Sequence, residues 1–160
     1  MIIRYARSEE AEILWVLRNR ALRHGCKNIY PENVLLAWTP EEMPPSYRQI
    51  IDDNPFFVID NEDGIPVASG FLSLSDRSVE AVFSLPEYSG KGHASQIIDA
   101  IKQEALSRNI ATLRLSSTPN ARSFYEKRGF KLIREDNYYS RLAASSLACF
   151  EMVCDLSERV

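Results

Sequence analysis

The most informative segment is residues 85–94, which read Leu85-Pro86-Glu87-Tyr88-Ser89-Gly90-Lys91-Gly92-His93-Ala94. A strand-like apolar pattern comes directly before this segment, and a helical pattern comes directly after it. The segment is therefore a strand-to-helix loop. Its two glycines allow backbone N–H groups to turn inward, because no side chain stands in the way. Such N–H groups, together with the positive end of a helix, form a cradle for phosphate. The segment therefore predicts an anion-binding loop.

Two common nucleotide-binding motifs do not match this loop. A P-loop needs Ser or Thr directly after a Gly-Lys pair, whereas Gly92 follows Lys91 here. The dinucleotide fingerprint needs a third glycine where Ser95 stands, and it belongs to a parallel sheet, whereas three antiparallel-looking strands come first. A Rossmann-type nucleotide protein remains one hypothesis, and it predicts a parallel strand order and binding of NAD or ATP.

Hydrophobic periodicity and turn residues predict the other elements. Ser8 is expected to cap the first helix. The expected helices are Glu9–Gly25, Glu32–Trp38, Ser46–Asp52, Gly92–Asn109 and Ala121–Arg128. The expected strands are residues 1–6, Phe56–Asp60, Ile65–Ser75, Ser78–Leu85, Thr112–Ser116, Phe130–Glu135 and Leu147–Leu156. This order predicts an α/β fold, with a mixed, largely antiparallel central sheet flanked by helices.

Composition limits the class of protein. The 160 residues are 45% hydrophobic and 26% charged, which is typical of one globular domain spanning residues 1–160. The net charge of −3 argues against a nucleic-acid partner. No apolar run reaches the roughly 18 residues of a membrane span, and no signal region is visible, so a soluble cytoplasmic protein is expected. Cys26, Cys149 and Cys154 form no metal motif; they are expected to be free, with the last two on opposite faces of one strand.

A second segment, at residues 116–130, reads Ser116-Ser117-Thr118-Pro119-Asn120-Ala121-Arg122-Ser123-Phe124-Tyr125-Glu126-Lys127-Arg128-Gly129-Phe130. With the glycine loop, it resembles the GNAT superfamily, the Gcn5-related N-acetyltransferases. The family's acetyl-CoA loop, Gln/Arg-x-x-Gly-x-Gly/Ala, matches residues 89–94, with Ser89 in place of Gln or Arg. The family's A-x-x-F-Y-x-x-x-G-F block matches residues 121–130. The order of helices and strands fits as well, so the resemblance spans nearly the whole chain.

The resemblance implies an enzyme that moves an acetyl group from acetyl-CoA to a primary amine, by direct attack in a ternary complex. It implies that the loop amides hold the pyrophosphate and that the pantetheine arm runs beside the end of the fourth strand. An amide near Ser84 or Leu85 is expected to bind the acetyl oxygen. The cofactor-binding residues expected on this basis are Val82, Phe83, Ser84, Leu85, Ser89, Gly90, Lys91, Gly92, His93, Ala94, Ser95 and Asn120.

Two residues are expected to move protons. Tyr125 is the expected general acid, because a phenol can donate to the departing thiolate of coenzyme A. A lysine-like amine has a pKa of about 10.4 and must lose a proton before it attacks. Glu80 is the expected base, on one strand face with Val82 and Ser84; a purely structural carboxylate is the alternative, and His24, Tyr30 and Glu32 are weaker candidates.

The acceptor is expected between residues 25–54 and a loop around Asp136–Ser146. Tyr30, Trp38 and Tyr47, with the acidic Glu32, Glu41 and Glu42, suit a cationic amine. The residues do not choose among a protein N-terminus, a lysine, a polyamine, an amino acid and an aminoglycoside, or between a monomer and a homodimer. A non-catalytic acyl-CoA-binding or regulatory module of the same fold is the alternative to an enzyme.

Overall fold

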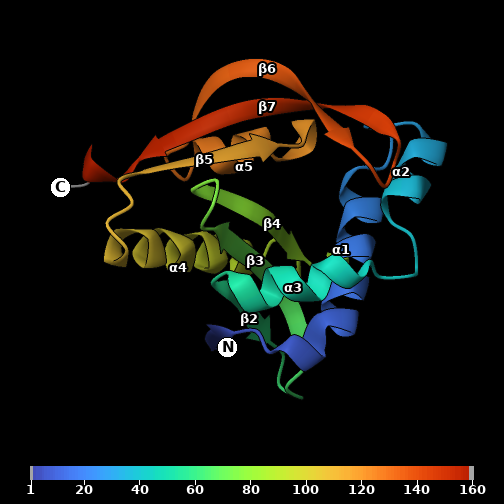
Figure 1. Cartoon of the computed structure of the whole chain (residues 1–160), viewed down its shortest axis with the longest axis horizontal. Helices are drawn as coiled ribbons and strands as arrows, with labels where there is room; N and C mark the ends of the chain where they lie inside the picture. The colour runs from blue at the N-terminus through green and yellow to red at the C-terminus, as the bar shows by residue number, and fades with distance from the viewer. Residues whose placement is uncertain (1, 159–160) are drawn as a thin grey trace.

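The computed structural model describes residues 2–158, so residue 1 of the first predicted strand lies outside the described residues. Seven strands form one sheet in the order β1-β2-β3-β4-β5-β7-β6 (Figure 1). All neighbouring strands are antiparallel except β4 and β5, which are parallel. The predicted mixed, largely antiparallel sheet is confirmed, and the parallel order of a Rossmann-type protein is excluded. The strands are β1 (Ile3–Tyr5), β2 (Phe56–Asp60), β3 (Pro66–Ser73), β4 (Ser78–Ser84), β5 (Thr112–Ser117), β6 (Lys131–Ser140) and β7 (Ser145–Asp155).

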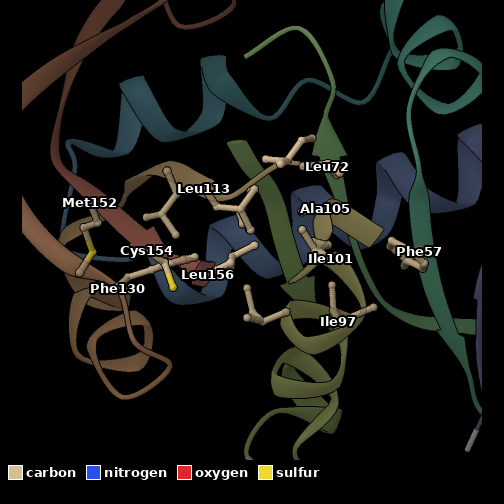
Figure 2. Packing of buried hydrophobic residues seen from close by; sticks show 14 of the residues in the cluster. Phe57, Leu72, Ile97, Ile101, Ala105, Leu113, Phe130, Met152, Cys154 and Leu156 are labelled. Carbon is tan, nitrogen blue, oxygen red and sulfur yellow. The ribbon is translucent and has the colours of Figure 1, made fainter. Parts of the chain in front are cut away.

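Helices cover both faces of the sheet. Helix α4 packs on β2, β3 and β4 on one face, and α1 packs on β3 and β4 on the other. Figure 2 shows the α4 side, where Ile97 and Ile101 of α4 meet Leu72 and Leu113 of the strands. We call these faces the α4 face and the α1 face. The helices are α1 (Ala11–Gly25), α2 (Glu32–Trp38), α3 (Pro45–Asp53), α4 (His93–Ser107) and α5 (Arg122–Glu126).

Gly70 allows α4 to lie close to the sheet. A Cβ atom at Gly70 would lie 2.6 Å from Ile97 Cγ2 and 3.0 Å from Val82 Cγ2. Both neighbours belong to the packed cluster on the α4 face. Glycine is therefore required here by the close approach of helix to strand.

The first helix begins later than predicted. Residues 8–10 form a 3₁₀ turn, and the α-helix starts at Ala11. Ser8 does not cap it; instead Arg7 is at the N-cap of the turn, and the Glu10 carboxylate accepts a hydrogen bond of 2.8 Å from the Arg7 backbone N–H. The carboxylate also binds the Arg4 guanidinium, and this ion pair draws Glu10 back toward the chain start.

The hairpin of β6 and β7 is longer than predicted. The residues expected to form a loop, Asp136–Ser146, are mostly strand, and only residues 141–144 form the turn between the two strands. Strand β6 is at the edge of the sheet, and residues 131–139 are exposed. Because neither face of β6 is buried, its sequence lacks the alternation that marks a strand, and pairing with β7 holds it extended. No helix in residues 2–158 is long and apolar enough to cross a membrane.

Candidate active site

The glycine loop presents a row of free backbone donors. Gly90 and Gly92 have positive φ angles of 76° and 86°, which glycine adopts without strain. Within residues 2–158, the backbone N–H groups from Gly90 to Ser95 donate to no protein acceptor. They lie at the N-terminus of α4, whose dipole adds positive potential. The loop is therefore built to bind an anion.

The side chains around the loop are mostly engaged with the protein itself. The Ser89 hydroxyl donates to the Pro86 carbonyl at 2.9 Å, and the Ser95 hydroxyl accepts from Arg128 Nε at 2.7 Å. Lys91 lies over the Tyr88 ring, 5.2 Å from its centroid. His93 is buried, and its Nδ1 atom has no hydrogen-bond partner among the described residues. The free donors of this loop are therefore the backbone N–H groups, together with the side chains of Lys91 and His93.

A gap opens between β4 and β5 beside this loop. The two strands pair only at Ser78 and Arg114, and their carboxyl-terminal halves diverge (Figure 1). The Leu85 N–H donates to the Val67 carbonyl of the neighbouring strand β3 at 2.9 Å, so the suggested role of Leu85 as an oxyanion donor is wrong. Because N–H directions alternate along a strand, the Ser84 N–H points away from β3 and toward the gap.

A β-bulge at Ala81 changes which way the side chains of β4 point. Ala81 has a φ of +54°, and the register with β3 skips one residue, since Phe71 pairs with Glu80 but Ser69 pairs with Phe83. Val82 consequently packs on the α4 face, whereas Glu80 and Phe83 lie on the α1 face. The expectation that Glu80 shares a face with Val82 is therefore wrong, because a bulge reverses the alternation beyond it.

Glu80 has a shifted proton affinity. Burial raises the pKa of its carboxyl to about 7, and the negative charges of Asp76 and Glu151 add to the rise. Glu151 is on β7, where its Oε1 accepts a hydrogen bond of 2.7 Å from the Ser116 hydroxyl of β5. Sequence reasoning missed Glu151 because no motif surrounds it; only the pairing of β5 with β7 brings it to the gap. A carboxyl with a pKa near neutrality can exchange a proton at physiological pH.

Tyr125 is close enough to Glu80 for the carboxylate charge to affect its hydroxyl. It is on α5 and packs against the cluster of the α4 face, with its ring 5.2 Å from that of Phe124 and 6.0 Å from that of Phe130. Burial raises the pKa of the Tyr125 hydroxyl, and the charge of Glu80 raises it further. The structure thus brings the two predicted proton-transfer residues together. Asn120 lies instead beside the end of α1, where its Oδ1 accepts from Cys26 Sγ at 3.7 Å.

Two of the three aromatic residues expected to line an acceptor site belong to the core. The Tyr30 hydroxyl is buried and donates to the Ala148 carbonyl at 2.7 Å. Tyr47 is buried with its ring 5.0 Å from that of Trp15. Trp38 is only partly buried, and the acidic residues of this region are exposed, as is His24. All three cysteines are free and buried; Cys149 lies beside Glu151 and Cys154 in the core of the other face, which confirms their opposite orientation.

Comparison with known families agrees with this geometry. The sequence model of the acetyltransferase (GNAT) domain matches residues 30–143, which is more than half of the chain. The chain belongs to the GNAT acetyltransferase family. This membership confirms the predicted fold, acetyl transfer as the general activity, and acetyl-CoA as the donor. No curated protein matches the sequence.

Several solved structures share the fold of this GNAT protein. A GCN5-related N-acetyltransferase from Rhodopseudomonas palustris superposes with a TM-score of 0.87 at 20% identity, over 97% of this chain and 95% of that one. The PaiA N-acetyltransferase of Thermoplasma acidophilum, in complex with coenzyme A, superposes with a TM-score of 0.74 at 18% identity, over 96% of this chain and 98% of that one. The yncA protein of Salmonella typhimurium, with its cofactor acetyl-CoA, superposes with a TM-score of 0.66 at 20% identity, over 100% of this chain and 96% of that one.

Proposed function

We propose that this GNAT protein is an N-acetyltransferase that moves an acetyl group from acetyl-CoA directly to a primary amine. One observation carries the proposal. The free backbone donors of Gly90–Ser95 lie beside a gap in the sheet, and near it are two titratable groups with raised pKa values, Glu80 and Tyr125, of which Glu80 is close enough for its charge to affect the Tyr125 hydroxyl. Perturbed groups that converge on such an opening are typical of a catalytic centre.

The donor half of the site consists of backbone groups. When bound, acetyl-CoA supplies an activated acetyl thioester. The N–H groups of Gly90–Ser95 have no protein acceptor among residues 2–158 and fit its pyrophosphate, so these residues hold the donor. The Ser84 N–H, which points into the gap, is the group that stabilises negative charge on the acetyl oxygen. Substitutions that keep the backbone conformation should therefore leave donor binding intact.

Glu80 is the proposed base. An amine acceptor is mostly protonated at neutral pH, and it must lose a proton to attack a carbonyl carbon. A carboxylate with a pKa of about 7 accepts a proton far better than an ordinary glutamate does. Glu151 assists by its charge, because a second carboxylate makes proton uptake by Glu80 more favourable.

Tyr125 is the proposed acid. Like any phenol, whose pKa is about 10, the hydroxyl is protonated at neutral pH, and its pKa is raised rather than lowered here, so it can donate to the sulfur of the departing thiolate. Packing against Phe124 and Phe130 holds the ring in one orientation. Such fixed placement lowers the cost of reaching the transition state.

Release of free coenzyme A tests the proposal. The protein is incubated with acetyl-CoA and one member of an amine panel: amino acids, polyamines, aminoglycosides and peptides with free N-termini. We expect thiol release that depends on an amine, with an acetylated product 42 Da heavier by mass spectrometry, as replacement of hydrogen by acetyl requires. Thermal stabilisation by acetyl-CoA with no amine-dependent thiol release would instead indicate the non-catalytic acyl-CoA-binding module.

A further inference from the structure

Among the residues that the structure describes, Arg18 of α1 has no counter-ion for its charged side chain. Its Nη1 atom donates to Asn19 Oδ1 at 2.7 Å and to the Trp38 carbonyl at 3.0 Å. Within residues 2–158, Nε and Nη2 donate to no protein group, and no carboxylate forms an ion pair with this guanidinium. Arg20, two positions along the helix, binds Glu87 with both carboxylate oxygens, whereas Arg23 donates to the hydroxyl and the carbonyl of Thr39.

The surroundings of Arg18 are aromatic. The guanidinium carbon lies 4.3 Å from the centroid of the Trp15 ring and 5.7 Å from that of Trp38. Burial lowers the pKa of Arg18 to about 10, so it remains a cation at neutral pH, and the nearest titratable groups are the phenols of Tyr47 and Tyr138. A cation in such a place has lost hydration without gaining a protein anion, which is rare unless a ligand supplies the charge.

The side chain is also held in place. The Asn19 side chain is buried, and while its Oδ1 accepts from Arg18, its Nδ2 donates to the Pro40 carbonyl at 2.8 Å. Trp15 Nε1 donates to the same carbonyl at 2.7 Å. Helix α1 and the segment between α2 and α3 therefore fix the guanidinium before any ligand binds, which reduces the entropic cost of binding.

The position of Arg18 is on the α1 face, the face on which Glu80 lies. Phe83, which shares that face of β4 with Glu80, packs against the cluster of Leu22, Leu35 and Leu147, and Trp38 packs against the same cluster. The donor loop is at the start of α4, which packs on the opposite face. An anion at Arg18 is therefore placed to be part of the acceptor rather than of the donor.

We propose that Arg18 binds a carboxylate of the acceptor through its free Nε and Nη2 donors, so that the enzyme acetylates small amines that carry a carboxylic acid, such as free amino acids. The inference rests on the proposed function. Nε and Nη2 are the edge of a guanidinium that pairs with both oxygens of a carboxylate. A requirement for a carboxylate on the acceptor separates amino acids from polyamines and aminoglycosides, which lack a carboxylate.

Matched acceptors test the inference. The standard amino acids, β-alanine and 4-aminobutyrate are each compared with the corresponding amide and with the decarboxylated amine, by coenzyme A release. We expect kcat/KM to be at least about 10-fold higher for the acid than for its amide. Arg18→Gln should lower kcat/KM about 100-fold for the acid and less than about 3-fold for the amide, and Arg18→Lys should restore part of the loss.

Arg20→Gln is the control, because Arg20 is on the same helix but already paired with an exposed carboxylate. It should leave the ratio of acid to amide unchanged. Equal rates for acids and amides in the unsubstituted enzyme, or equal losses in Arg18→Gln, would overturn the inference while leaving the proposed function intact. If no amine releases coenzyme A, the proposed function fails. Thermal shift then decides the inference: stabilisation by an acid but not by its amide, lost in Arg18→Gln, supports it, and the absence of that difference overturns it.

Discussion

The proposed donor half and acceptor half of the site use different parts of the polypeptide. The proposed donor half consists of backbone N–H groups that follow one another along residues 90–95. The proposed acceptor half consists of side chains, Arg18, Glu80 and Glu151, that come from α1, β4 and β7. A backbone site depends on local conformation, whereas a side-chain site depends on how distant elements pack. The two halves should therefore respond differently to substitution.

The largest effect is expected at Tyr125, the proposed acid. Tyr125→Phe removes only the hydroxyl, so the ring packing with Phe124 and Phe130 is preserved. We expect kcat to fall about 100-fold to 1000-fold, because the thiolate loses its proton donor. The dissociation constant of acetyl-CoA, measured by calorimetry, should change less than about 2-fold. An unchanged kcat would remove Tyr125 from the chemistry.

Glu80→Gln should affect the proposed acceptor half alone. The pKa of Glu80 is raised to about 7, so kcat/KM in the unsubstituted enzyme should fall as pH drops below 7 and Glu80 becomes protonated. The variant should lose about 100-fold in kcat/KM at pH 8, and the break near pH 7 should disappear from its profile, which leaves only the slope that ionisation of the amine itself produces. The measurement is the pH dependence of coenzyme A release. A variant that keeps the break near pH 7 would show that another group is the base.

The same substitution should stabilise the protein at high pH. The Glu80 pKa is higher in the folded protein than the value of about 4.3 for an unfolded chain, so the folded state binds the proton more tightly. The contribution of Glu80 to the free energy of unfolding is fully present below about pH 4, and it is lost as the pH rises through about 7. Glu80→Gln should therefore raise the free energy of unfolding by about 1 to 3 kcal/mol at pH 8 and little at pH 4. Denaturation with urea measures it, with the exposed Glu62→Gln as control.

Glu151→Gln should shift the pH profile without abolishing activity. Removing its charge makes ionisation of Glu80 easier, so the acidic limb of kcat/KM should move to lower pH by about 0.5 to 1 unit. Glu135→Gln, an exposed change on the neighbouring strand, should not move the limb. If both variants gave the same profile, the charge of Glu151 would have no part in setting the affinity of Glu80 for its proton.

The smallest effect is expected in the proposed donor half, at Gly92. Its φ of +86° disfavours any other residue, although a Cβ there would meet nothing within 4 Å. Gly92→Ala should raise KM for acetyl-CoA about 5-fold to 10-fold through backbone strain, with KM for the amine unchanged. Gly64→Ala is the matched control, because Gly64 also has a positive φ angle and open space around the position of a Cβ atom. It should cost similar stability but leave KM for acetyl-CoA unaltered.

Sequence reasoning succeeded where the signal is local. The glycine loop and the Tyr125 block are continuous segments, and their geometry follows from glycine conformations and helix ends over a few residues. Glu80 was found by its place on a strand, but its orientation was misjudged because the bulge at Ala81 leaves no trace in the alternation of side chains. The predicted strand, Phe130–Glu135, is shorter than β6, because an exposed edge strand needs no hydrophobic face and its pattern gives no signal.

The amino-acid sequence alone indicated the family and the anion-binding form of residues 85–94, because a phosphate cradle is a property of consecutive backbone amides. Only the tertiary structure supports the proposed acceptor half. Glu151 pairs with Ser116 through the pairing of β5 with β7, and within residues 2–158 Arg18 has no counter-ion, because the packing of α1 against Trp38 brings no carboxylate to it. Burial and charge of this kind depend on residues far apart in the chain, and no short motif records them.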